Sequence, residues 1–120
     1  MKLVVLYIDK SKKDNRPYYE IELEEKNIKK RLKKVGVICK KTFYNYDLYV
    51  SSFEDSKIVK MISYMKKEKI DTFVISSNYS LPYYTSYGYG DEQRFLNYFE
   101  KRNIKICYYN SIESYFSLDG

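Results

Sequence analysis

Four short apolar runs, each bounded by charged or turn-forming residues, constrain the fold of this chain more than any other feature. They are Leu3–Ile8, Val37–Cys39, Thr72–Ile75 and Ile104–Tyr108. Runs of this length, rich in β-branched side chains, are typical of buried strands. The segments between them carry apolar residues at helical spacing. This alternation predicts an α/β fold with a single, mostly parallel sheet of four to five strands and helices packed on it.

Three segments between the runs have the periodicity of amphipathic helices. The first covers Tyr19–Val35, and Gly36 follows it where a left-handed residue is favoured. The second begins at Asp55 or Ser56, and Asp91 caps the third. Their inward-facing residues are expected to be Ile21, Ile28, Leu32, Val35, Ile58, Met61, Ile62, Met65, Phe95, Leu96 and Phe99.

Three stretches have no clear period. Thr42–Val50 either extends the second strand or forms a loop, and Ser76–Gly90 reads as a long polar and aromatic loop. Loops of that length in compact domains are usually functional. Residues 110–120 are expected to trail away from the last strand.

Length and composition limit the class of protein. A chain of 120 residues is expected to form one domain, residues 1–120, and no apolar stretch approaches the ~20 residues of a membrane span. The N-terminal apolar run is too short for a signal peptide, so a cytoplasmic location is expected. Cys39 and Cys107 lie in apolar runs and are expected to be buried as small hydrophobic residues. The absence of histidine excludes histidine-based catalysis, and neither a metal nor a cofactor is expected.

The formal net charge is +6, and the excess is concentrated in one segment. Between residues 26 and 41 there is no acidic residue, and the basic residues are Lys26, Lys29, Lys30, Arg31, Lys33, Lys34, Lys40 and Lys41. A basic surface of this kind attracts phosphate backbones and gives salt-dependent binding to nucleic acid. A solvated helix face is the alternative interpretation, and the sequence leaves both open.

The chain contains sixteen tyrosines, and five of them fall in the loop 76–90. They are Tyr79, Tyr83, Tyr84, Tyr87 and Tyr89. Tyrosines interleaved with basic residues stack on nucleobases, and tyrosine-rich patches also form protein interfaces. In a parallel sheet this loop, the loop after Val50 and Ser11 all lie at the carboxyl edge of the strands, where sites in such folds gather.

Three stretches resemble a known family. The segment VVLYIDKS is similar to the first strand of the resolvase/invertase (serine recombinase) catalytic domain, whose motif is Tyr, any residue, Arg, any residue, Ser. Tyr7 and Ser11 match this motif, and Asp9 stands at the arginine. The segment KMISYMKKEKIDTFVISSNYSLPYY resembles the family's second helix and third strand, and DEQRFLNYFEKRNIKICYYNSIES resembles the following helix and strand. The resemblance extends from about residue 3 to residue 117.

The resemblance implies that Ser11 is the nucleophile of a site that includes Tyr7, with Arg16 the one arginine near it. In the family, clustered arginines stabilise the charge on the attacked phosphate, because guanidinium groups bind its oxygens bidentately. Three of those arginine positions are occupied here by Asp9, Ser80 and Tyr83. This departure implies a domain whose catalytic activity is impaired.

Three hypotheses about function follow. The first is a recombinase-like domain that acts in DNA binding or in assembly with a recombinase or another component of a mobile element. The second is a small regulatory or inhibitor protein that binds another protein through the tyrosine-rich loop. The third is an active recombinase fragment that uses Ser11, with the missing arginines supplied by a partner subunit. A homo-oligomer is compatible with each, and a membrane partner is not expected.

Overall fold

The computed structural model describes residues 2–9, 17–45, 56–76 and 91–116. Its strands are β1 (Lys2–Asp9), β2 (Val37–Asn45), β3 (Thr72–Ile75) and β4 (Lys105–Tyr108). Its helices are α1 (Tyr18–Lys34), α2 (Ser56–Lys67), α4 (Asp91–Glu100), the short 3-10 helix η1 (Tyr109–Ser111) and α5 (Ile112–Phe116). None of the described helices is long and apolar enough to cross a bilayer.

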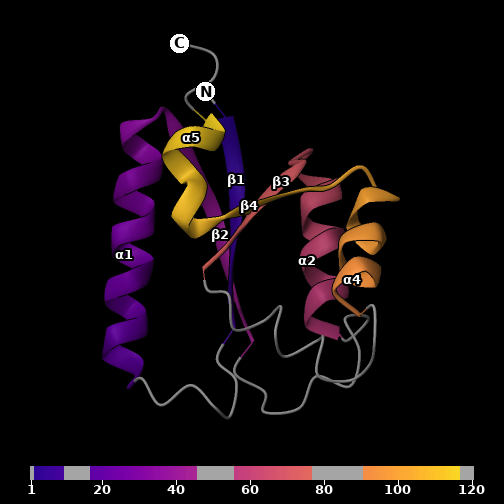
Figure 1. Cartoon of the computed structure of the whole chain (residues 1–120), viewed down its shortest axis with the longest axis horizontal. Coiled ribbons are helices and arrows are strands. Elements are labelled where there is room, and N and C mark those ends of the chain that lie inside the picture. The colour runs from indigo at the N-terminus through magenta and orange to yellow at the C-terminus, as the bar shows by residue number, and fades with distance from the viewer. Residues whose placement is uncertain (1, 10–16, 46–55, 77–90, 117–120) are drawn as a thin grey trace.

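The four strands form one sheet in the order β2-β1-β3-β4, and every neighbouring pair is parallel. Helices α1 and α5 lie on one side of this sheet, and α2 and α4 lie on the other (Figure 1). The predicted α/β architecture is therefore confirmed. The strand order reverses direction between β1 and β3, and in sheets of this kind ligands bind beyond the carboxyl ends of the strands at such a reversal.

Each face of the sheet has its own apolar core. Beneath α1 and α5 the core contains the β1 side chains Val4, Leu6 and Ile8 together with residues of both helices. Beneath α2 and α4 the core is built on Val5 and Tyr7, which point the opposite way. Because β1 lies in the middle of the sheet, it is buried on both faces, which is why its sequence is a continuous apolar run instead of an alternating one.

Strand β2 extends beyond its apolar start and contains a β-bulge. The bulge shifts the alternation of its side chains between the two faces of the sheet by one residue. Val4 pairs with Cys39 but Val5 pairs with Lys41, so Lys40 is an extra residue in β2. Before the bulge the odd-numbered side chains face α1, and after it the even-numbered ones do. The open choice for residues 42–50 is thus resolved as far as Asn45, and residues 46–50 lie outside the described part.

Three helices end in a residue with positive φ, which turns the chain into the next strand. These residues are Gly36, Lys69 and Asn103, with φ of 78°, 58° and 58°. The backbone N–H of Lys69 donates to the carbonyl of Lys66, and the backbone N–H of Ile70 donates to the carbonyl of Met65. This hydrogen-bond pattern is the Schellman motif. The expectation of a left-handed residue at Gly36 is confirmed.

Residues 110–116 were expected to trail away from β4, but they pack against the domain. This segment forms η1 and α5, and Ile112 of α5 is fully buried in the core beneath α1. A five-residue helix is too short to be stable alone, so it depends on this contact with the rest of the domain. The fourth-strand prediction was also one residue too long, because Ile104 precedes β4.

Candidate nucleic-acid interface

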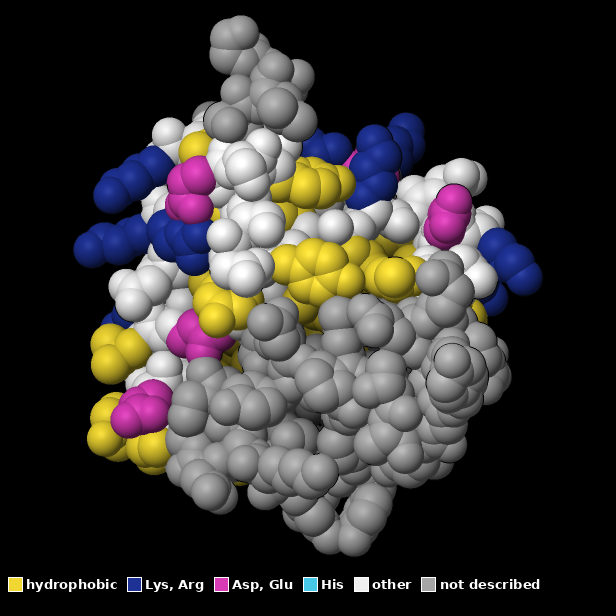
Figure 2. All heavy atoms as spheres, in the orientation of Figure 1, with side chains coloured by type: hydrophobic (Ala, Val, Ile, Leu, Met, Phe, Trp, Pro, Cys, Tyr) yellow, Lys and Arg dark blue, Asp and Glu magenta, His cyan; other side chains and the backbone are white. Residues whose placement is uncertain are grey.

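The outward face of α1 carries four exposed lysines, which are Lys26, Lys30, Lys33 and Lys34. At 100° per residue they lie within one sector of the helix, opposite its buried residues Ile21, Ile28 and Leu32. None of the four lysines forms an ion pair with a described residue. In Figure 2 dark-blue side chains project from the flank that α1 forms in Figure 1.

The other four basic residues of the segment 26–41 do not join this face. Lys29 Nζ lies 2.7 Å from Glu25 Oε2, and Arg31 binds a carboxylate of α5. Lys40 is the bulge residue of β2. Lys41 faces α2, where its Nζ lies 5.2 Å from the centroid of the Phe43 ring and 5.0 Å from that of Tyr64. The eight residues therefore do not form one patch.

Arg31 holds α5 against α1. Its Nε and Nη2 donate to the two carboxylate oxygens of Glu113, over 2.7 and 2.6 Å. These hydrogen bonds lower the pKa of Glu113 to about 2 and raise the pKa of Arg31. A planar guanidinium suits this two-point contact, whereas lysine does not. Arg31 is thus a structural residue that also borders the groove described next.

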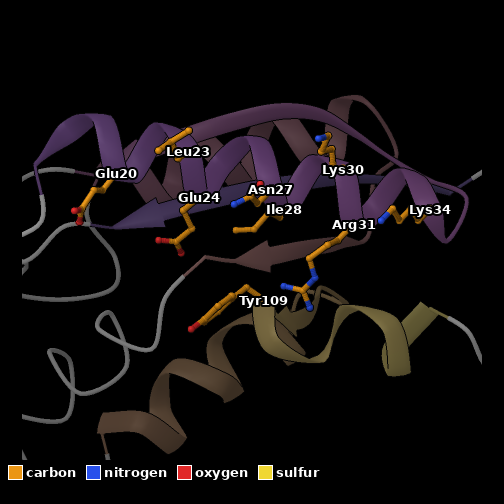
Figure 3. Close-up of a pocket in the computed structure, with 9 residues that line it drawn as sticks. All are labelled: Glu20, Leu23, Glu24, Asn27, Ile28, Lys30, Arg31, Lys34 and Tyr109. Atoms are coloured by element: carbon orange, nitrogen blue, oxygen red, sulfur yellow. The ribbon is translucent and has the colours of Figure 1, made fainter.

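A groove of about 670 Å³ runs along α1 on the side of η1. Figure 3 shows the Tyr109 ring lying across this groove from α1. The groove is lined by Glu20, Leu23, Glu24, Asn27, Ile28, Lys30, Arg31, Lys34 and Tyr109. Carboxylates line one end of the groove and cations line the other, with Ile28, Asn27 and the Tyr109 ring between them (Figure 3). Sequence reasoning missed this groove, because Tyr109 lies far from α1 along the chain.

Glu25, which the sequence analysis did not single out, is a charged residue buried on the inner face of α1 at 9% exposure. Thr42 Oγ1 and Tyr44 Oη of β2 donate to its two oxygens over 3.0 and 2.6 Å. Burial alone would raise its pKa, but these hydrogen bonds and that from Lys29 outweigh burial and hold the pKa of Glu25 below 4.5. The carboxylate therefore stays ionised and joins α1 to the edge strand.

At the carboxyl edge of the sheet, Tyr7 is the predicted catalytic residue that the structure describes. It is 2% exposed and belongs to the core beneath α2, where its ring centroid lies 6.3 Å from that of Phe73. Its backbone carbonyl accepts a hydrogen bond from the N–H of Ser76, whose buried Oγ has no partner among the described residues. Ser11 and Arg16 lie outside the described residues.

The predicted partner loop also lies outside the described residues, with all five of its tyrosines: Tyr79, Tyr83, Tyr84, Tyr87 and Tyr89.

Two of the four arginines are held away from this carboxyl edge. Arg102 lies in the turn between α4 and β4, at the opposite edge. Its guanidinium lies 3.7 Å from the centroid of the Tyr98 ring, and its Nη1 donates to the Tyr98 carbonyl. Arg31 is bound by Glu113 on the α1 side of the sheet.

The two cysteine thiols are neutral in this arrangement. Burial raises the pKa of Cys107 to about 11 and also raises the pKa of Cys39, so both thiols are protonated at neutral pH. Cys107 is fully buried, as predicted, whereas Cys39 is only partly buried. Among the residues that the structure describes, no cluster of cysteine, aspartate or glutamate side chains has the arrangement of a metal site.

The fold and these surfaces define the class of this protein as a small α/β domain with helices on both faces of a parallel sheet and a basic helix face. Comparison of the chain with protein family models, with curated proteins and with solved structures finds no match. The resemblance to serine recombinases is therefore a prediction that rests on the segments quoted for it.

Proposed function

We propose that this chain is a cytoplasmic, recombinase-like domain that binds nucleic acid through the outward face of α1 and does not itself cleave DNA. The observation that carries the proposal is the row of exposed lysines, Lys26, Lys30, Lys33 and Lys34, none of which forms an ion pair with a described residue.

Helix geometry makes these four lysines suitable for a phosphate backbone. Lys26 and Lys34 are eight residues apart, which is about 12 Å along the helix axis. Each phosphate that a lysine neutralises releases condensed counterions, so the affinity falls with salt at a slope of about −0.9 per contact. Four contacts predict a log–log slope of about −3.6 on duplex DNA.

The positions of Arg31 and Arg102 support a role without strand cleavage. The guanidinium of Arg31 binds Glu113, and that of Arg102 lies against Tyr98. Both lie away from the carboxyl edge of the sheet. Removal of one such electrostatic donor typically costs about 100- to 1,000-fold in rate. Arg31 and Arg102 therefore do not supply this stabilisation at the carboxyl edge of the sheet.

Duplex binding, measured by fluorescence anisotropy over a salt series, tests the proposal. The variant Lys26→Glu/Lys33→Glu should make the slope shallower, with a magnitude of about 1.8 or smaller, because two of the four contacts are lost. The matched control is Lys66→Glu/Lys67→Glu, which makes the same change in net charge on exposed residues at the end of α2. This control should bind almost as the unchanged protein does.

Equal losses in both variants would show that binding follows net charge alone and would refute the assignment to α1. No duplex or single-strand binding at low salt would refute nucleic-acid binding altogether. A covalent protein–DNA adduct that disappears in Ser11→Ala would refute the non-catalytic role. We expect no adduct.

A further inference from the structure

The groove between α1 and η1 has the composition of a site for a nucleotide. In its middle Ile28 and Asn27 of α1 lie opposite the Tyr109 ring, and Leu23 lies toward the carboxylate end (Figure 3). Its volume of about 670 Å³ is within the ordinary range for small-ligand sites, about 300–1,000 Å³. An aromatic ring beside apolar side chains is the usual platform for an unpaired base.

Charge is divided along the length of this groove. Lys30 and Lys34 line the end near the C-terminus of α1, and both are exposed. Glu20 and Glu24 line the other end. A phosphate is attracted to the lysine end and repelled from the carboxylate end. A carboxylate, in turn, accepts hydrogen bonds from the exocyclic amino group of a base.

We propose that this groove holds one unpaired nucleotide of a single-stranded nucleic acid. Its phosphate lies at Lys30, its base lies against Tyr109, and its amino group faces Glu24, with Lys34 and Glu20 adding charge of the same sign farther out at each end. This inference rests on the proposed function and deepens it, because it states which form of nucleic acid the α1 side recognises. A paired base cannot enter the groove without leaving its stack.

The first test compares single strands by anisotropy. The unchanged protein should bind a short oligodeoxycytidylate several-fold more tightly than an oligodeoxyuridylate. Cytosine has an amino group that donates a hydrogen bond to a carboxylate, whereas uracil has a carbonyl oxygen at the same position. Glu20→Gln/Glu24→Gln should remove this preference. Equal binding of the two strands by the unchanged protein would overturn the proposed orientation.

The second test concerns the stacking platform. Tyr109→Leu should weaken binding of the oligodeoxycytidylate by at least about fivefold, the lower limit for loss of one stacked base. Tyr109→Phe keeps the ring and should bind as before. Tyr19→Leu is the matched control, because Tyr19 is a 64% exposed tyrosine on α1 that does not line the groove.

Folding is checked separately, because Tyr109 also packs against the core beneath α1. If Tyr109→Leu unfolds, quenching of 2-aminopurine in an otherwise abasic strand reports stacking on the unchanged protein. Absence of quenching would overturn the inference, as would equal effects of Tyr109→Leu and Tyr19→Leu. The duplex experiment on Lys26 and Lys33 is independent of the groove, so the proposed function survives if only the groove fails.

Discussion

Tyr44→Phe measures how strongly the buried carboxylate of Glu25 holds β2 against α1. The change keeps the ring and removes only the hydroxyl, which donates to Glu25 Oε1 over 2.6 Å. A hydrogen bond to a charged group contributes about 1.5–3 kcal/mol. Tyr44 is 39% exposed, so water replaces part of the lost bond, and we expect a loss near the lower limit, about 1.5 kcal/mol.

For a domain of this size, 1 kcal/mol corresponds to about 4 °C in Tm, so the variant should melt about 6 °C lower. Urea denaturation should show the same loss in the free energy of unfolding with an unchanged m value. Tyr19→Phe is the matched control, because the Tyr19 side chain is 64% exposed, and its stability should change by less than about 0.5 kcal/mol.

The pH dependence gives a second check on the same reasoning. Because the pKa of Glu25 is lowered on folding, its ionised form stabilises the fold fully above pH 4.5, and this stabilisation is lost as the pH falls through the lowered pKa. The difference between Tyr44→Phe and the unchanged protein should therefore shrink below pH 4.5. A loss under about 0.5 kcal/mol at neutral pH, or a difference that stays constant into acid, would refute the role of Glu25.

Four further substitutions test other parts of the fold. Gly36→Ala should cost about 1 kcal/mol and lower Tm by about 4 °C, since an added Cβ meets nothing within 4 Å and only the positive φ is unfavourable; an unchanged Tm would contradict this. Lys69→Gly should raise Tm by a few degrees, and Asn103→Gly by less, because asparagine tolerates this conformation better than lysine; a lower Tm for Lys69→Gly would contradict it. The hydrogen bonds from Arg31 lower the pKa of Glu113 to about 2. Ionised Glu113 therefore stabilises the fold above the ordinary pKa of glutamate, and this stabilisation is lost as the pH falls towards 2. Melting curves of Glu113→Gln and the unchanged protein should therefore differ at neutral pH and converge near pH 2.

The central elements were predictable because burial on both faces leaves a plain signal. A run such as Thr72–Ile75 has all four side chains buried, and β3 has the predicted bounds. The buried stripes of α1 and α2 were likewise visible as helical periods, with Ile21 and Ile58 among their buried members. In these segments the local pattern and the tertiary environment agree.

The remaining features depend on contacts between residues distant in sequence. Glu25 interrupts the buried stripe of α1, and no local signal shows that Tyr44 of β2 lies opposite it. Helix α5 is stabilised through Ile112 and through the bond from Arg31, which is 82 residues away from Glu113. The spacing of Ile112, Tyr115 and Phe116 is the one local sign of this helix. The groove was missed for the same reason, because its two walls meet only in the folded chain.

The bulge at Lys40 determines which face of the sheet each later residue of the edge strand occupies. With Lys40 present, Tyr44 reaches Glu25 while Phe43 packs its ring 5.6 Å from that of Tyr64 on the opposite face. If Lys40 instead joined the ladder opposite Val5, every residue from Lys41 to Asn45 would move to the other face of the sheet. A phenylalanine ring would then face the carboxylate, and a tyrosine hydroxyl would enter the apolar side. Loss of Lys40 alone leaves Cys39 opposite Val4 and Lys41 opposite Val5, so this position can be deleted without exchanging the two faces, whereas an inserted residue that joins the ladder cannot be accommodated in this way.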